Sequence, residues 1–229
     1  MSHDSQYSGG STSREPDILR RERGTYARND VAYLPVPCQH CEKAPCVDAS
    51  NGAIFYRPDG IVMIDMAKAK GNKALVDSCP YGAIWWNEEA DIAQKCIFCA
   101  HLLDDPSWEP GVPRCVHTCP TGAMTFVSEE PQAFAKRIEA EGLAAYKEDI
   151  VARPHVWYKN LHRFTKNFIA GQVLKGGDVA PEVTVTLKGA GSQAELVSDM
   201  FGEFRFDGLS DGEYTLVAEG KELAKVTIL

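Results

Sequence analysis

The alternation of apolar and polar residues is clearest in the C-terminal part of the chain. From residue 168 onward, short alternating runs are separated by turn residues that include Gly189, Gly202 and Gly220. This pattern is typical of antiparallel strands joined by tight turns. It predicts a small all-β sandwich or barrel. We expect its strands at residues 169–174, 183–188, 194–198, 203–206, 214–218 and 224–229.

The middle of the chain has the spacing of a helix. Phe134, Ile138 and Leu143 recur as on one helical face, and Gly142 is suited to end that helix. We therefore predict a helical connector within residues 128–167.

Composition and charge narrow the classes of function. The 229 residues are 44% hydrophobic and 24% charged, which is typical of a folded protein of one or two domains. The formal net charge of −8 disfavours nucleic acid and anionic membranes as partners. No apolar window is long enough to span a bilayer, and residues 1–13 lack the apolar segment of an export signal. We expect a cytoplasmic protein.

Eight cysteines, all within residues 38–119, introduce candidate chemistry. A reducing cytosol disfavours a disulfide framework, so their spacing points to metal ligation. The first three follow a C-x2-C-x4-C pattern, and two later ones precede proline. The bacterial ferredoxin run C-x2-C-x2-C-x3-C-P binds [4Fe-4S] clusters, whereas a four-cysteine zinc site, the alternative, has no need of Cys-Pro. The candidate ligands are Cys38, Cys41, Cys46, Cys79, Cys96, Cys99, Cys115 and Cys119.

The region contains an internal repeat. Cys79 and Cys119 each begin the run Cys-Pro-x-Gly-Ala. Residues 50–54 (SNGAI) repeat it with Ser50 and Asn51 in place of the Cys-Pro pair. This third copy therefore lacks its ligand.

In two-cluster ferredoxins the first three cysteines of a run bind one cluster, and the cysteine of the Cys-Pro pair binds the other cluster. This exchange of ligands, here called crossover wiring, divides the positions of this chain into two sets. The set that keeps all its ligands is Cys38, Cys41, Cys46 and Cys79. The set that has lost them all is Ser50, Ala69, Asn72 and Leu75. Random loss of four ligands would remove one whole cluster in only about 2 of 70 arrangements. The sequence thus predicts one intact cluster and one deleted cluster.

The remaining cysteines form a second candidate site with an unresolved ligand. Cys96, Cys99 and Cys115 supply three thiolates, while crossover wiring assigns Cys119 to a different cluster. Residues 1–37 contain no cysteine. Three alternatives stay open: Cys119 closes the cluster locally, the fourth ligand is not cysteine, or a native N-terminal segment precedes Met1.

These motifs carry a family resemblance. The chain resembles the iron-sulfur electron-transfer subunits of molybdopterin enzymes of the dimethyl sulfoxide reductase class. Within that class it is most similar to the small subunits of the group that includes pyrogallol-phloroglucinol transhydroxylase and resorcinol hydroxylase. The matching stretches are residues 20–30, 38–46, 59–65, 79–89 and 93–105.

The resemblance implies a non-catalytic chain in a heterodimer. Catalysis would belong to a large subunit that carries molybdenum and pterin and acts on a polyhydroxylated aromatic compound, although another substrate of a molybdopterin oxidoreductase is an alternative. The family also implies a further four-cysteine motif near the N-terminus, which this chain lacks. Residues 202–214 resemble carboxypeptidase-regulatory or transthyretin-like domains. A zinc-binding structural adaptor is the rival from another class.

Several side chains near the cysteines could influence the reduction potentials of the clusters. Histidines beside the ligands could donate hydrogen bonds to sulfur, or could simply pack or face solvent; they are His40, His101 and His117. An apolar wall that excludes water, or an ordinary core, would consist of Trp85, Trp86, Ile97 and Phe98. A basic run could pair with an acidic partner or remain solvated; it comprises Arg20, Arg21 and Arg23.

Together these features predict an α+β protein with four segments. Residues 1–37 form an N-terminal arm and residues 38–127 a ferredoxin-like iron-sulfur domain. Residues 128–167 form the helical connector, and residues 168–229 the β-sandwich domain.

Overall fold

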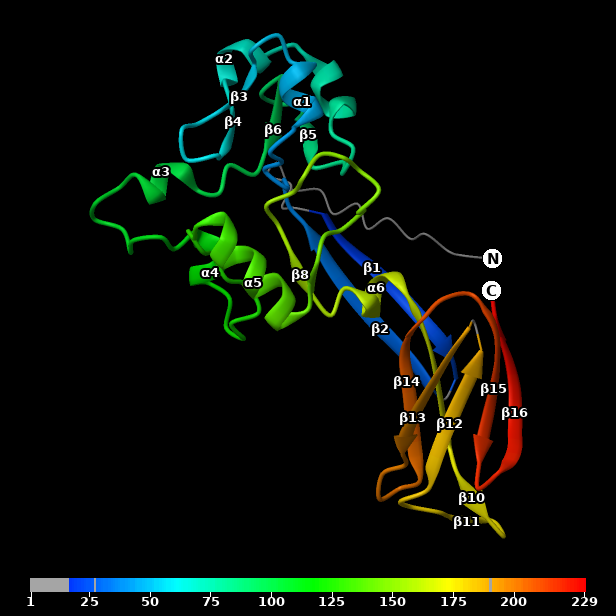
Figure 1. Ribbon diagram of the computed structural model, residues 1–229. Coiled ribbons are helices and arrows are strands. Elements are labelled where there is room, and N and C mark those ends of the chain that lie inside the picture. Colours follow the sequence, from blue (N-terminus) through cyan, green and yellow to red (C-terminus); the bar gives the residue numbers. More distant parts are fainter. Residues whose placement is uncertain (1–16, 27, 190) are drawn as a thin grey trace. The chain divides into compact units, whose positions relative to one another are not determined.

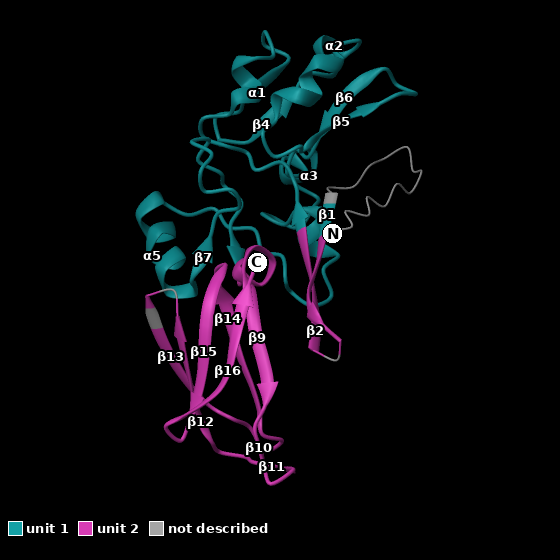
Figure 2. Cartoon of the chain, turned by 90° about the vertical axis from the view of Figure 1, so that its right-hand side faces the viewer, with its two compact units in different colours: residues 1–19, 35–159 teal, residues 20–34, 160–229 magenta. Residues whose placement is uncertain are grey.

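The computed structural model describes residues 17–26, 28–189 and 191–229. Residues 1–16 of the predicted N-terminal arm lie outside this described chain. Two units are distinguished in Figure 2. Unit 1 comprises residues up to Leu19 together with Pro35–Lys159, and unit 2 comprises Arg20–Leu34 together with Asn160–Leu229. Residues 20–34 of the predicted arm therefore belong with the C-terminal strands.

In the described part of unit 1, short helices alternate with two-stranded antiparallel sheets (Figure 1). Strand β3 pairs with β4, β5 with β6, and β7 with β8. The helix predicted from the spacing of Phe134 and Ile138 is present as α5. The elements are α1 (Pro45–Asp48), β3 (Ile54–Tyr56), β4 (Val62–Ile64), α2 (Met66–Ala69), the 3-10 helix η1 (Lys73–Ser78), β5 (Ile84–Asn87), β6 (Ile92–Lys95), α3 (Ala100–Leu103), α4 (Arg114–His117), α5 (Pro131–Glu141), β7 (Leu143–Ala144) and β8 (Tyr158–Lys159).

The short helices begin where the local sequence favours a helix start. Pro45 is the first residue of α1, where its fixed φ and missing N–H carry no cost. The carboxylate of Asp65 caps α2 by accepting hydrogen bonds from the backbone N–H groups of Ala67 and Lys68. Cys46 lies within α1, and α2 contacts β6, which ends directly before Cys96.

Unit 2 contains all six strands predicted downstream of residue 168. Its main sheet has the order β13-β12-β15-β16, and β14 pairs with β9 in a second sheet. The sequence pattern missed the small β10-β11 hairpin and the pair formed by β1 (Asp17–Thr25) and β2 (Arg28–Val36). The other elements are α6 (His162–Thr165), β9 (Asn167–Gln172), β10 (Leu174–Lys175), β11 (Asp178–Val179), β12 (Thr184–Gly189), β13 (Ser192–Val197), β14 (Glu203–Leu209), β15 (Gly212–Ala218) and β16 (Lys221–Ile228).

One apolar core joins the two sheets of unit 2. Burial alternates along β12, β14 and β15, as expected when one face of each strand is turned inward. Leu187 lies opposite Leu216 in the main sheet, and Ile169 lies opposite Phe206 in the second. The buried members of this core are Ile169, Val173, Ala180, Val183, Val185, Leu187, Phe204, Phe206, Tyr214, Leu216 and Ala218.

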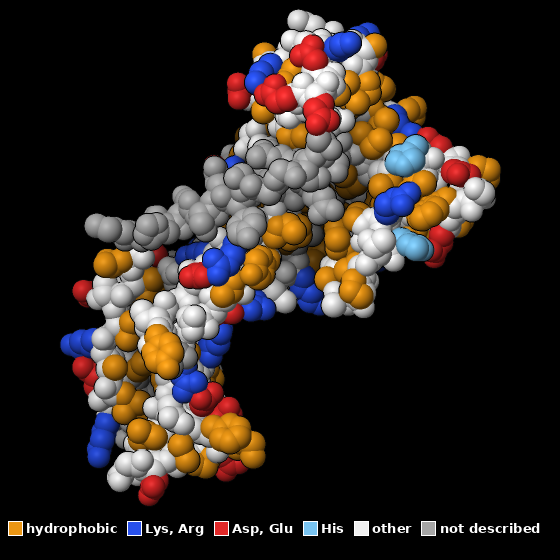
Figure 3. All heavy atoms as spheres, turned by 180° about the vertical axis from the view of Figure 1, so that it is seen from behind, with side chains coloured by type: hydrophobic (Ala, Val, Ile, Leu, Met, Phe, Trp, Pro, Cys, Tyr) orange, Lys and Arg blue, Asp and Glu red, His pale blue; other side chains and the backbone are white. Residues whose placement is uncertain are grey.

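The surface is mixed in charge. On the face shown in Figure 3, acidic and basic side chains are interspersed with apolar ones. Within residues 17–26, 28–189 and 191–229, no helix combines the length and the apolar character that crossing a membrane requires.

A buried arginine ties the first strand pair to the C-terminal part of unit 2. The side chain of Arg23 is 1% exposed and donates to Asp30 at 2.5 Å and to Asp207 at 2.9 Å. It also donates to the carbonyl of Lys166 at 2.9 Å and lies 5.0 Å from the centroid of the Phe168 ring. Arg23 therefore forms its ion pairs within its own chain. Both alternatives predicted from the sequence, pairing with an acidic partner and remaining solvated, are wrong for this residue.

Replacing Arg23 with methionine tests this connection. Asp30 and Asp207 would remain partly buried without their main cation, so we expect the free energy of unfolding to fall by about 3 kcal/mol in urea denaturation. The matched change Arg205→Met removes a more exposed partner of the same carboxylates and should cost about 1 kcal/mol.

The same contacts predict an acid sensitivity. Hydrogen bonds from Arg23 and then Arg205 hold the pKa of Asp30 well below its usual range. A lowered carboxyl pKa stabilises the fold above the unfolded value of about 4, and this contribution is lost as the pH falls below it. Arg23→Met should lose less stability on acidification than the unsubstituted chain, and an equal loss would contradict the assignment.

Candidate iron-sulfur sites

All eight cysteines lie in unit 1, and all have free thiols. Cys38, Cys41 and Cys46 are buried, whereas Cys115 is exposed. The thiols are thus available as ligands, and three of them are already shielded from water.

The structure brings Cys38, Cys41, Cys46 and Cys79 together. Burial, and after it the neighbouring sulfurs of Cys38 and Cys79, raise the pKa of Cys41 to about 12 and that of Cys46 to about 11. Burial also raises the pKa of Cys79. Such thiols resist ionisation in the absence of a metal, whereas a bound metal ion favours the thiolate directly. This chemistry suits a ligand group rather than a nucleophile.

Cys96, Cys99, Cys115 and Cys119 form a looser second group. Burial raises the pKa of Cys96 to about 11, and the sulfurs of Cys38 and Cys115 contribute. Burial, and after it the sulfurs of Cys99 and Cys119, raise the pKa of Cys115. Cys119 differs, because a threonine hydroxyl and backbone N–H groups lower its pKa to about 7. The interaction of Cys96 with Cys38 makes the two groups neighbours.

The copies of the repeated segment share a turn at their glycine. The backbone N–H of Ala83 lies 3.4 Å from Sγ of Cys79. In the copy without cysteine, the N–H of Ile54 donates to Oγ of Ser50 at 2.9 Å. Counted from the shared glycine, this bond lies one residue later than that of Ala83, because Gly52 and Gly82 align Ala49, and not the predicted Ser50, with Cys79. The glycine shared by all three copies has a positive φ, which glycine adopts without strain: +80° at Gly52, +68° at Gly82 and +64° at Gly122.

The positions that lack cysteine are occupied by packed side chains. Ser50 and Leu75 are each 2% exposed, and Ala69 is fully buried. The hydroxyl of Ser50 donates to the carbonyl of Val47 at 2.8 Å. The interior is therefore packed at these positions with a hydroxyl, a methyl and a leucine side chain in place of thiols.

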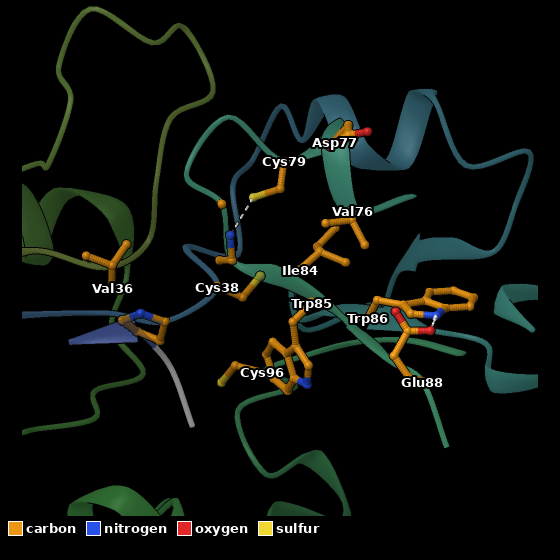
Figure 4. A pocket seen from close by; sticks show the side chains of 13 residues that line it. Val36, Cys38, Val76, Asp77, Cys79, Ile84, Trp85, Trp86, Glu88 and Cys96 are labelled. Carbon is orange, nitrogen blue, oxygen red and sulfur yellow. Dashed lines mark hydrogen bonds between the residues drawn. The ribbon is translucent and has the colours of Figure 1, made fainter. Parts of the chain in front are cut away.

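A cavity of about 720 Å³ lies beside the first group (Figure 4). Cys38, Cys79 and Cys96 line it together with Trp85 and Trp86. The indole N–H of Trp85 is buried without an acceptor among the described residues. Thiols from both groups, apolar walls and a spare buried donor fit a group that presents sulfur acceptors, as a [4Fe-4S] cluster does.

His40 is the buried member of the three predicted histidines, at 1% exposure. Its Nδ1 accepts the backbone N–H of Val62 at 3.0 Å, which assigns the ring proton to Nε2. That Nε2 is buried and makes no well-formed hydrogen bond within the described chain, although the backbone of Cys96 interacts with the ring. Burial, with Lys95 contributing, lowers the pKa of His40 to about 2, so the ring is neutral. The other two predicted histidines, His101 and His117, are exposed.

The side chains predicted to form an apolar wall, Trp85, Trp86, Ile97 and Phe98, are half-buried. Trp85 and Trp86 lie on β5 at the cavity, and the Phe98 ring stacks on His40 with a centroid distance of 3.7 Å. All of these aromatic side chains remain partly exposed, so they cover the cysteine groups without enclosing them.

Lys95, the last residue of β6, was not among the candidate residues predicted from the sequence. Its side chain belongs to the buried interior at 6% exposure. The available signal was its place directly before Cys96, but lysine is seldom buried, and local sequence alone did not indicate its burial.

A site for a single metal ion is a different arrangement. Within the described residues, no group of three or more His, Cys, Asp or Glu side chains is placed to hold one ion. A cluster distributes its thiolates over four irons rather than one, so this finding does not bear on cluster binding.

The sequence is similar to those of known proteins. The family model of the 4Fe-4S dicluster domain matches residues 29–129. The chain is 50% identical over 93% of its length to the pyrogallol hydroxytransferase small subunit of Pelobacter acidigallici, and the match covers 79% of that relative. It is 38% identical over 59% of its length to the beta subunit of the perchlorate reductase of Dechloromonas aromatica, covering 41% of it. It is 34% identical over 56% of its length to a subunit of the tetrathionate reductase of Salmonella typhimurium, covering 52% of it.

The two thiol environments predict selective alkylation of the cluster-free chain. Near neutral pH, iodoacetamide should modify Cys119 at least about tenfold faster than Cys41, because the thiolate is the reactive form. The rate at Cys119 should rise with pH and level off above its pKa of about 7. Peptide mass spectrometry would measure both rates, and equal rates at all eight thiols would contradict the described environments.

A second prediction concerns the deleted cluster. The single change Asn72→Cys should leave the iron content per chain unchanged, because Ser50, Ala69 and Leu75 still supply no thiolate at the other three positions. Iron and sulfide analysis against the unsubstituted chain would measure this. A gain of about four irons from this change alone would refute the crossover wiring.

Proposed function

Because this chain belongs to the family of iron-sulfur small subunits of molybdopterin enzymes of the dimethyl sulfoxide reductase class, we propose that it holds two [4Fe-4S] clusters for a large subunit acting on a polyhydroxylated aromatic compound. Electron transfer is the role of this family, and the 4Fe-4S domain spans residues 29–129. The observation that supports the proposal most directly is the presence of eight free thiols in two neighbouring groups.

The ligand assignment follows the two groups. The first cluster would be held by Cys38, Cys41, Cys46 and Cys79. The second would be held by Cys96, Cys99, Cys115 and Cys119. When bound, a [4Fe-4S] cluster supplies a centre that gains and loses single electrons.

The chain's own residues prepare the surroundings of these sulfurs. The backbone N–H of Ala83 is directed at Sγ of Cys79, and Trp85 and His40 each hold a buried N–H that makes no well-formed hydrogen bond in the described chain. Donors of this kind stabilise the more negative, reduced state of a cluster and raise its potential.

The substrate class is supported by one relative. The protein that is 50% identical over 93% of this chain is a pyrogallol hydroxytransferase small subunit, and pyrogallol is a polyhydroxylated benzene. The subunits of perchlorate and tetrathionate reductases match a smaller share of the chain at lower identity. We therefore favour aryl hydroxyl transfer over oxyanion reduction in the partner subunit, with molybdopterin located only there.

Unit 2 would serve as a scaffold in a heterodimer. Two sheets that share one core support a sandwich of the transthyretin-like or carboxypeptidase-regulatory type. We place the complex in the cytoplasm, because eight unpaired thiols suit a reducing compartment.

Metal and sulfide analysis of the anaerobically isolated full chain, with the partner that co-purifies, tests the proposal. We expect about eight irons per chain, molybdenum in the larger partner, and conversion of a polyhydroxylated benzene by the complex. Zinc without iron would overturn the proposal, and a complex that reduces only oxyanions or sulfur compounds would overturn its substrate class.

Paired substitutions identify the ligands. Cys41→Ser should abolish one of the reducible centres seen by electron paramagnetic resonance, since the first group loses a buried thiolate. Asn72→Ser, at a position without a ligand role, should keep both centres. Loss of the same signal in both variants would indicate damage to the fold rather than loss of a ligand.

A further inference from the structure

Lys95 places a buried ammonium group between the two cysteine groups. Its Nζ donates to Sγ of Cys38 at 3.5 Å, to the carbonyl of Cys96 at 2.9 Å, and to the carbonyl of Val62. Cys38 belongs to the first group and Cys96 to the second. One side chain therefore contacts both.

The contacts of Lys95 match the donors that an ammonium group carries. A lysine ammonium has three N–H donors, and here three acceptors surround it. None of the three is a carboxylate, so the positive charge is not neutralised by a hydrogen-bonded acid. Burying a cation is costly unless an anion compensates it, and the thiolate of Cys38 is the one acceptor here that can become anionic.

The strand geometry explains why this lysine is turned inward. Side chains alternate along β6, so that Ala93 and Lys95 share the buried side. Lys95 lies opposite Ile84 of β5, which is also buried. The pairing of β5 with β6 thus holds the ammonium group in the interior rather than allowing it to extend to solvent.

Val62 of β4 fixes the side chain of His40 as well as that of Lys95. The N–H of Val62 donates to His40, and its carbonyl accepts from Lys95. Both side chains are thereby held in one orientation beside Cys38. The position of the Lys95 charge is consequently set by backbone hydrogen bonds and not by a mobile surface contact.

We propose that Lys95 is the fixed counter-cation of the cluster bound through Cys38 and that it raises the reduction potential of that cluster above that of an equivalent site without the charge. This inference rests on the proposed function. Reduction adds one electron, and so one negative charge, to a centre whose thiolate ligands are already anionic. A nearby cation stabilises the added charge. The effect should be larger at the first site, where Nζ contacts a sulfur, than at the second, where it contacts a carbonyl.

The test is an anaerobic potentiometric titration of the iron-loaded full chain, followed by electron paramagnetic resonance. In Lys95→Met the equilibrium constant for reduction of the centre that Cys41→Ser abolishes should fall at least tenfold, which is a downward shift of about 59 mV for one electron. Lys95→Arg keeps the charge and should reverse most of this shift. Lys73→Met, which removes an exposed lysine that pairs with Glu88, should leave both potentials unchanged.

The outcomes separate the two proposals. Absence of iron-sulfur centres from the unsubstituted chain would sink the proposed function. Loaded variants whose potentials do not differ would overturn the role of Lys95 alone, as would an equal shift in Lys73→Met.

A measurement on the unsubstituted protein covers the case in which Lys95→Met fails to load. With lysine selectively labelled with nitrogen-15, pulsed electron paramagnetic resonance of the reduced first centre should show a coupled lysine nitrogen. No such coupling would overturn the proposal.

Discussion

Burial of thiols that must become thiolates is the constraint on which unit 1 depends. Removing Cys41 and Cys46 from water is the largest cause that raises their pKa values to about 12 and 11, so the fold by itself opposes the charge state that a ligand needs. Metal binding reverses this by supplying positive charge where the fold has excluded water. Folding of this unit and binding of its cofactor are therefore linked. A cavity that is unfavourable for free thiolates is favourable for a cluster that neutralises them.

The backbone around these sulfurs does not depend on the ligand. The loop at Ser50 keeps the glycine with positive φ, and a hydrogen bond of its own, from the N–H of Ile54 to the hydroxyl of Ser50, closes the loop without a thiol. Ala69 and Leu75 complete the packing. The repeated segment is thus stable as a turn in its own right, which explains how one cluster position is filled by ordinary side chains while the neighbouring strands β3 and β5 retain the same start.

Elements that depend on neighbouring residues in the sequence were predicted, whereas contacts between residues far apart in the sequence were not. The alternating pattern identified all six strands downstream of residue 168, because one face of each carries apolar side chains that are buried in a shared core or packed against it. The spacing of the cysteines grouped Cys38 with Cys79, which the structure brings together. The grouping of residues 20–34 with the C-terminal strands was not predicted, because the contact of Arg23 with Asp207 joins residues 184 positions apart. No local pattern carries that information.

Polar groups inside unit 1 are arranged by the backbone more than by one another. Val62 uses its N–H to fix His40 and its carbonyl to fix Lys95, so a single residue of a three-residue strand orients a neutral donor and a cation beside Cys38. These two groups act in the same direction, since each stabilises added negative charge. They differ in range, because the histidine requires contact with an acceptor, whereas the charge acts through the low-dielectric interior. The strand pair β3-β4 thereby becomes part of the electrostatic environment of cysteines that lie outside it.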